Sequence, residues 1–190
     1  MSTEIDGAVT IVSGGTQGLG EAVARKLAGA GPRRSGGLVL VGRSADRGAA
    51  LAAELTDAGT RTIFVHADLS DPNAPARVVD ACDSEFGVVH GLVNIAALTT
   101  RAHLWSDTPE HFDKMMAINA KAPYFLIQAA TRLMIREGAT GSIVNVGSVA
   151  ATGGPPKLTP YAMSKAALAA LTKNLAFMLL PHHIRVNQVN

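Results

Sequence analysis

Tyr161 and Lys165 are the residues of this 190-residue chain whose types and spacing point most directly to chemistry. Residues four positions apart on a helix lie on one face, so these two side chains are predicted to be neighbours. An ammonium group beside a phenol favours the phenolate, and such a tyrosine can exchange a proton with an alcohol or a carbonyl near neutral pH. The spacing alone is a weak indication, because many long helices carry it by chance.

A glycine-rich segment at residues 13–20, SGGTQGLG, is the second pattern that points to chemistry. It follows an apolar run and opens a helical pattern. Glycines there permit a tight turn and let backbone amides approach a pyrophosphate, while the helix N-terminus adds partial positive charge. The alternative is a turn needed only for packing a helix on a strand. Its place directly after the first predicted strand favours cofactor binding, and the glycines are spaced G-x-x-x-G-x-G.

These residues need a scaffold, and the apolar pattern predicts one. Strands that are apolar on both faces and separated by helices indicate a parallel sheet covered on both sides. We therefore predict an α/β fold with a doubly wound parallel sheet, a Rossmann fold of three α/β/α layers, with strand order 3-2-1-4-5-6. The predicted strands span 8–12, 38–41, 62–65, 91–94, 142–146 and 184–189, and the helices 18–30, 45–58, 74–86, about 109–136 and about 160–180. Thr159 and Pro160 are predicted as the N-cap and first residue of the last helix.

Composition narrows the class of protein. Hydrophobic residues make up 47% and charged residues 17%, which predicts one packed domain over residues 1–190. The net charge of +2 gives no reason to expect a nucleic-acid partner. With one cysteine, Cys82, and no histidine at a metal-ligand spacing, we expect neither an intrachain disulfide nor a metal site. Neither a signal-peptide pattern nor an apolar run of about 20 residues is present, so we expect no membrane association and a cytoplasmic protein.

Taken together, the glycine spacing and the Tyr161-x-x-x-Lys165 pair resemble the short-chain dehydrogenase/reductase family, of the single-domain type. The resemblance covers the whole chain, and the common order of its motifs argues against chance. Further matches are Asp68-Leu69 after the third predicted strand, Asn94-Ile95-Ala96-Ala97 after the fourth, Asn119 in the long helix, Ser148 after the fifth strand, and Arg185-Val186-Asn187 before the position of the family's P-G motif.

The resemblance implies an NAD(P)(H)-dependent oxidoreductase that interconverts a secondary alcohol and a ketone by hydride transfer. It implies that Tyr161 is the general acid/base and that Lys165 binds the nicotinamide ribose and favours the phenolate. Ser148 would hydrogen-bond the substrate oxygen, and Asn119 would hold a water in a proton relay behind Lys165. The structural alternatives are a serine that caps a turn and an asparagine bonded to neighbouring backbone. The implied cofactor-binding residues are Gly14, Thr16, Gln17, Gly18, Leu19, Gly20, Arg43, Asp68, Leu69, Asn94, Ala96, Tyr161 and Lys165.

The residues at the end of the second predicted strand indicate whether the cofactor is NAD or NADP. An acidic residue there would bind the ribose 2′-hydroxyl of NAD, but no carboxylate occurs until Asp46. Arg43 can instead meet the 2′-phosphate of NADP, although the neutral Gln17 leaves the glycine segment without a second basic residue. We therefore expect NADP in preference to NAD. The alternative is that Arg43 stacks on adenine and tolerates both.

Two departures from the family pattern concern the fourth strand and the end of the chain. Ile95 replaces the second asparagine of the N-N-A-G motif and Ala97 replaces its glycine, which we expect to change packing more than chemistry. The chain stops at Asn190, inside an apolar strand, where the family continues into its P-G motif, substrate lid and last strand. We interpret this as a C-terminal truncation that removes the last strand and the lid, and we expect these 190 residues alone to be inactive or unstable.

Other functions remain open from the sequence. One alternative is a catalytically silent nucleotide-binding or regulatory protein on the same fold. Another is a nucleotide-sugar epimerase or dehydratase, whose glycine loop runs G-x-x-G-x-x-G, but Glu21 stands at the third glycine position. Loops 99–107 and 150–157 are expected at the site mouth and suggest an alcohol or ketone, a sugar, a polyol or a 3-oxoacyl compound. The two long helices resemble those that form homodimers or homotetramers in the family.

Overall fold

A six-stranded parallel sheet forms the centre of the molecule, whose computed structural model describes residues 7–29, 35–153 and 156–190. The predicted strand order is confirmed as β3-β2-β1-β4-β5-β6. Every neighbouring pair is parallel. Each strand begins and ends within one residue of its prediction, because short apolar runs between helices are a strong local indication of buried strands. The strands are β1 (Val9–Ser13), β2 (Gly37–Gly42), β3 (Thr62–His66), β4 (Gly91–Asn94), β5 (Gly141–Val146) and β6 (Ile184–Val189).

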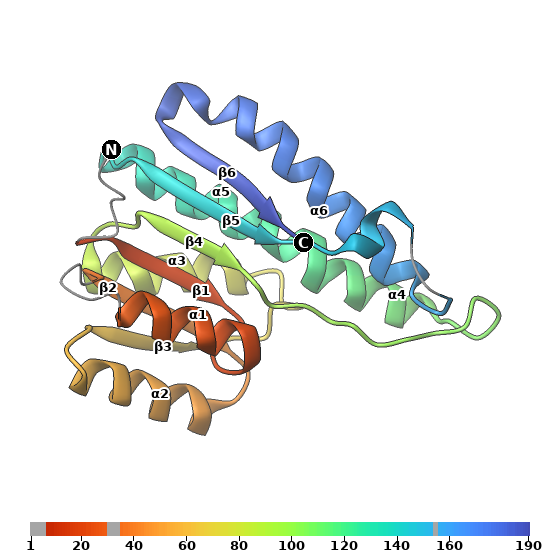
Figure 1. Cartoon of the computed structure of the whole chain (residues 1–190), viewed down its shortest axis with the longest axis horizontal. Helices are drawn as coiled ribbons and strands as arrows, with labels where there is room; N and C mark the ends of the chain where they lie inside the picture. The colour runs from red at the N-terminus through yellow and green to blue at the C-terminus, as the bar shows by residue number, and fades with distance from the viewer. Residues whose placement is uncertain (1–6, 30–34, 154–155) are drawn as a thin grey trace.

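Helices cover both faces of the sheet, which confirms the three-layer α/β/α arrangement. Alternate residues of β2 enter different cores, since Leu38 and Leu40 pack with α1 and α2 while Val39 and Val41 pack with α3 and α5. In Figure 1, α1 lies in front of the sheet and α3 and α5 pass behind it. The helices are α1 (Gly18–Ala28), α2 (Ala45–Asp57), α3 (Ala74–Phe86), α4 (Pro109–Met116), α5 (Ala122–Arg136) and α6 (Thr159–Met178).

The long helix predicted over about 109–136 is not continuous. A π-helical turn, Ala117–Lys121, separates α4 from α5, and the N–H of Ala122 donates to the carbonyl of Ala117, five residues back. Pro123 explains the change, because proline has no N–H for the carbonyl of residue 119 and its ring crowds that carbonyl. Asn119 therefore lies in a widened turn, a feature often found at functional sites.

The helix that carries Tyr161 and Lys165 begins one residue before the predicted position. Leu158 is its N-cap and makes no side-chain capping bond, so the prediction of Thr159 as the cap was wrong. Thr159 is instead the first helical residue, and Pro160 follows in the first turn, where its missing N–H costs nothing. Tyr161 therefore enters the helix directly behind a rigid residue.

Candidate functional site

A cavity of about 320 Å³ lies at the carboxyl ends of the central strands. The strand order changes direction between β1 and β4, and ligands of doubly wound sheets bind beside that switch point. The cavity wall comes from the loops after β1, β2, β3 and β4. Its lining residues are Gly14, Thr16 to Gly20, Val41 to Arg43, Ala67 to Leu69, Ile95 to Leu98, and Ile118.

The glycine segment brings three pieces of backbone closer together than other residues would allow. Gly14 has a φ of +72°, and a Cβ there would lie 2.8 Å from the amide nitrogen of Ala96. A Cβ on Gly20 would lie 1.9 Å from the carbonyl oxygen of Gly14. The start of α1 is thus held against the end of β1, with its first amides free of any capping side chain from Gln17. This cradle fits the pyrophosphate of a dinucleotide, which backbone amides at a helix N-terminus bind well.

The carboxylate of Asp68 lies in the wall on the β3 side. Its Oδ1 accepts hydrogen bonds from the N–H of Ser70 at 2.9 Å and from the Ser70 hydroxyl at 2.8 Å. These bonds, the backbone one foremost, lower the pKa of Asp68 and keep it ionised. Eleven cofactor-binding residues were predicted besides Tyr161 and Lys165, and all of them except Asn94 line the cavity.

Asn94 is buried behind the cavity wall. Its Nδ2 donates to Asn145 Oδ1 at 2.8 Å, and Asn145 Nδ2 donates to Thr172 Oγ1 at 2.9 Å. This chain of bonds joins β4, β5 and α6, while Asn94 Oδ1 accepts no bond from any residue in the described part of the chain. Asn94 therefore helps to fix α6 against the strand ends. Asn145 and Thr172 were not predicted, because their partners are distant in sequence.

Tyr161 and Lys165 are neighbours, as their spacing predicts. The Lys165 ammonium lies 5.9 Å from the centroid of the Tyr161 ring. Lys165 is only 2% exposed, and its Nζ donates to the carbonyl of Val146 at the end of β5, at 2.6 Å. Burial lowers the pKa of Lys165 to about 8, so the group is still mainly an ammonium at pH 7. The fold therefore holds a positive charge next to the phenol.

Replacing Lys165 by methionine is expected to stabilise the protein without cofactor near pH 7. Because the pKa of Lys165 falls from 10.5 to about 8 on folding, the unfolded chain binds the proton more tightly between those values. Burying the Lys165 ammonium therefore lowers the free energy of unfolding by its full amount below pH 8. This destabilisation disappears as the pH rises toward 10.5, so the free energy of unfolding changes by about 3 kcal/mol over that range. Urea denaturation at pH 7 to 10 measures it. Parallel pH profiles of the free energy of unfolding for the two proteins would contradict the expectation.

Asn119 connects the cavity to α6, the helix that carries Tyr161 and Lys165. It is 1% exposed; its Oδ1 accepts from the N–H of Leu98 at 2.7 Å, and its Nδ2 donates to the carbonyl of Leu98 at 2.9 Å. The same Nδ2 donates to Ser164 Oγ at 3.0 Å, and Ser164 donates to the carbonyl of Tyr161 at 2.7 Å. The amide thus bonds a distant segment rather than neighbouring backbone. Its side chain is occupied by protein partners, so a water relay would have to use its backbone carbonyl.

Ser148 lies at the end of β5, where the sequence places it. It is the N-cap of a 3₁₀ turn, Val149–Thr152, and its Oγ accepts from the N–H of Ala150 at 3.1 Å. This is the turn-capping arrangement that the sequence left open as an alternative. Because the hydroxyl acts there as an acceptor, its proton stays available for a substrate oxygen. The hydrogen bonds found within the described ranges do not join Ser148 to Tyr161.

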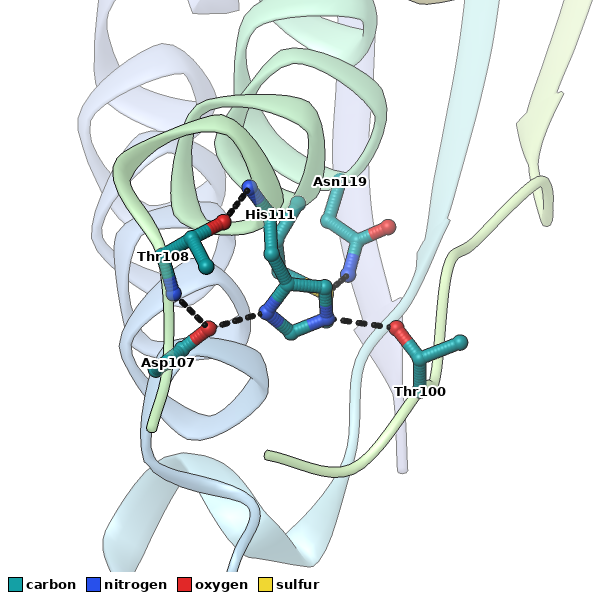
Figure 2. Close-up of polar contacts among 6 residues, drawn as sticks. Thr100, Asp107, Thr108, His111 and Asn119 are labelled. Atoms are coloured by element: carbon teal, nitrogen blue, oxygen red, sulfur yellow. Dashed lines mark hydrogen bonds and ion pairs between the residues drawn. The ribbon is translucent and has the colours of Figure 1, made fainter. Parts of the chain in front are cut away.

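The loop after β4 is anchored at several points. Figure 2 shows His111 of α4 between Asp107 and Thr100, with Nδ1 2.6 Å from the Asp107 carboxylate and Nε2 2.7 Å from the Thr100 hydroxyl. Farther along, the N–H of Ala102 donates to the carbonyl of Lys157 at 3.0 Å. The two loops predicted at the site mouth, 99–107 and 150–157, therefore touch; residues 154 and 155 lie outside the described residues.

The described residues contain no helix with the length and apolar character that crossing a bilayer requires. Nor do their His, Cys, Asp and Glu side chains form any group of three that could hold a metal ion.

Known proteins resemble this chain along almost all of its length. A family profile described as short chain dehydrogenase matches residues 8–190. The L-rhamnose 1-dehydrogenase (NAD(P)(+)) of Azotobacter vinelandii is 37% identical over 94% of this chain and 70% of its own length. The NADP-dependent (R)-specific alcohol dehydrogenase of Lentilactobacillus kefiri is 32% identical over 100% and 74%.

A solved structure agrees with the sequence comparison. The short chain dehydrogenase from Burkholderia cenocepacia, crystallised in complex with NADP, superposes with a TM-score of 0.91 at 34% identity. The match covers 99% of this chain and 75% of that one. Sequence, fold and the glycine-lined cavity, which is linked through Asn119 to the helix that carries Tyr161 and Lys165, lead to the same conclusion: the chain belongs to the short-chain dehydrogenase family of oxidoreductases.

Proposed function

We propose that this protein is an NADP(H)-preferring oxidoreductase that interconverts a secondary alcohol and a ketone, with Tyr161 as the general acid/base. One observation carries the proposal. Leu98 in the wall of the glycine-lined cavity is hydrogen-bonded to Asn119. Asn119 is in turn hydrogen-bonded to Ser164, which donates to the backbone carbonyl of Tyr161. The backbone of Tyr161 is therefore held in a fixed relation to the end of the cavity. A short fixed path of this kind is what a reaction between a cofactor and a substrate requires.

The proposed chemistry divides between the cofactor and the chain. NADP(H), when bound, supplies or accepts the hydride. In the reducing direction the Tyr161 hydroxyl gives its proton to the carbonyl oxygen of the substrate, and in the oxidising direction the phenolate takes it back. The Lys165 ammonium, 5.9 Å from the ring centroid, stabilises the phenolate that forms. Ser148 donates a hydrogen bond from its hydroxyl to the substrate oxygen and holds that oxygen near Tyr161.

The class of substrate is suggested by two relatives of this chain. The names of the two relatives mention a sugar, L-rhamnose, and an (R)-specific alcohol. Both kinds of compound carry a hydroxyl on a carbon that can become a carbonyl. We therefore propose a secondary alcohol or its ketone, with sugars and polyols as the first compounds to examine.

Cofactor titration followed by a turnover screen on this protein tests the proposal. Binding of NADPH and NADH is followed by fluorescence. Turnover is then measured with sugars, polyols, simple ketones and 3-oxoacyl thioesters. We expect NADPH to bind more tightly than NADH and at least one compound to be turned over. If neither cofactor binds, the proposed function is wrong and the glycine segment serves packing alone.

A further inference from the structure

Two arginines lie around the start of α2, although only one of them was predicted to bind cofactor. Arg43 follows β2 and lines the cavity. Arg47 lies in the first turn of α2, and its Nη1 donates to Gln17 Oε1 at 3.0 Å. Since Gln17 also lines the cavity, the Arg47 guanidinium is hydrogen-bonded directly to a residue of the cavity wall. A second hydrogen bond, which Arg47 Nε donates to Ser44 Oγ at 3.3 Å, also orients the guanidinium.

The charge of Arg47 has no carboxylate partner among the ion pairs of the described residues, whereas the charge of Arg43 acts on the Asp68 carboxylate and helps to lower its pKa. Arg25 and Arg136 each form ion pairs with two carboxylates, but the ion pairs found in the described part of the chain include neither Arg43 nor Arg47. Both also lie at the N-terminal end of α2, where the helix dipole disfavours a positive charge. An anion bound at this end of α2 would therefore relieve the unfavourable interaction of these charges with the helix dipole.

We infer that Arg47 acts with Arg43 to bind the 2′-phosphate of NADP(H), and so sets the preference of this protein for NADP(H) over NAD(H). The inference rests on the proposed function, because it concerns the same cofactor site. In the glycine segment, the neutral Gln17 leaves the 2′-phosphate without a second basic residue. The structure supplies that charge from α2, thirty positions later in the chain, with Gln17 as its hydrogen-bond partner. Arg47 is thus a specificity residue that does not touch the reacting atoms.

Cofactor binding by the Arg47→Ala variant tests the inference without any need for turnover. We expect the Kd for NADPH to rise about 10-fold and the Kd for NADH to change less than about twofold, since only NADPH carries the 2′-phosphate. The same contrast is expected between the probes adenosine 2′,5′-bisphosphate and 5′-AMP. Arg132→Ala is the matched control, because Arg132 is an exposed arginine on α5, on the opposite face of the sheet.

Gln17→Ala separates a direct contact from an indirect one. If Arg47 binds phosphate itself, Gln17→Ala retains the preference for NADPH while Arg47→Ala loses it. Equal weakening of NADPH and NADH by Arg47→Ala would show that Arg47 only supports the glycine segment, and would overturn the inference. An Arg47→Ala variant that binds both cofactors like the parent would overturn it too. Failure of the parent protein to bind either cofactor would instead refute the proposed function.

Discussion

Replacing Tyr161 by phenylalanine is expected to lower kcat by about 1,000-fold while leaving NADPH binding within a few-fold of the parent. The substitution removes one hydroxyl and keeps the ring that packs near Lys165. A positioned general acid or base contributes about 10²- to 10⁴-fold, and the Tyr161 ring lies beside the buried Lys165 ammonium. Steady-state turnover on the best substrate of the screen, together with fluorescence titration of NADPH, measures both quantities.

The chain provides a matched control for this prediction. Tyr124 is its only other tyrosine; it is exposed on α5 and lies against Phe125. Tyr124→Phe is expected to keep full activity. If Tyr161→Phe retained more than a tenth of the parent's activity, another group would have to be the acid. Loss of NADPH binding together with activity would show that the hydroxyl serves mainly to bind cofactor.

Replacing Gly20 by alanine is expected to weaken dinucleotide binding by more than about 100-fold and to destabilise the fold by about 3 kcal/mol. The added Cβ would lie 1.9 Å from the carbonyl oxygen of Gly14 and 2.7 Å from its carbon. Both are backbone atoms, so α1 must move away from the end of β1, and overpacking of this kind costs about 1–3 kcal/mol or more. Thermal unfolding and NADPH titration measure the two effects.

Gly18→Ala is the appropriate comparison within the same segment. Its Cβ would meet nothing within 4 Å, and only the φ of +53° disfavours alanine, by about 1–2 kcal/mol. We expect this variant to fold and to bind NADPH more weakly than the parent but far better than Gly20→Ala. If Gly20→Ala bound NADPH as tightly as Gly18→Ala, close approach of α1 to β1 would not be what forms the site. The comparison remains informative should Gly20→Ala fail to fold.

Local sequence was sufficient to predict the strands, the topology and the pairing of Tyr161 with Lys165. Buried strands such as β2 are short runs of apolar residues, and alternation with helices leaves one favoured order for a parallel sheet. The neighbourhood of Tyr161 and Lys165 follows from helix geometry alone. Even the break at Ala117–Lys121 had a local indication, because Pro123 cannot donate to the carbonyl four residues earlier. The position of the glycines directly after β1 likewise predicted that they line the cavity.

Tertiary structure alone decided how these parts are joined. Asn119 reaches Leu98 and Ser164 across gaps of 21 and 45 positions, and Asn94 reaches Asn145 across 51. Arg47 reaches Gln17 across 30 positions and brings a charge to a glycine segment that has none of its own. Periodicity and motif spacing describe neighbours along a helix or strand, whereas these contacts depend on how packed elements lie against each other. The sequence therefore determined which groups can do the chemistry, and packing determined what holds them in place.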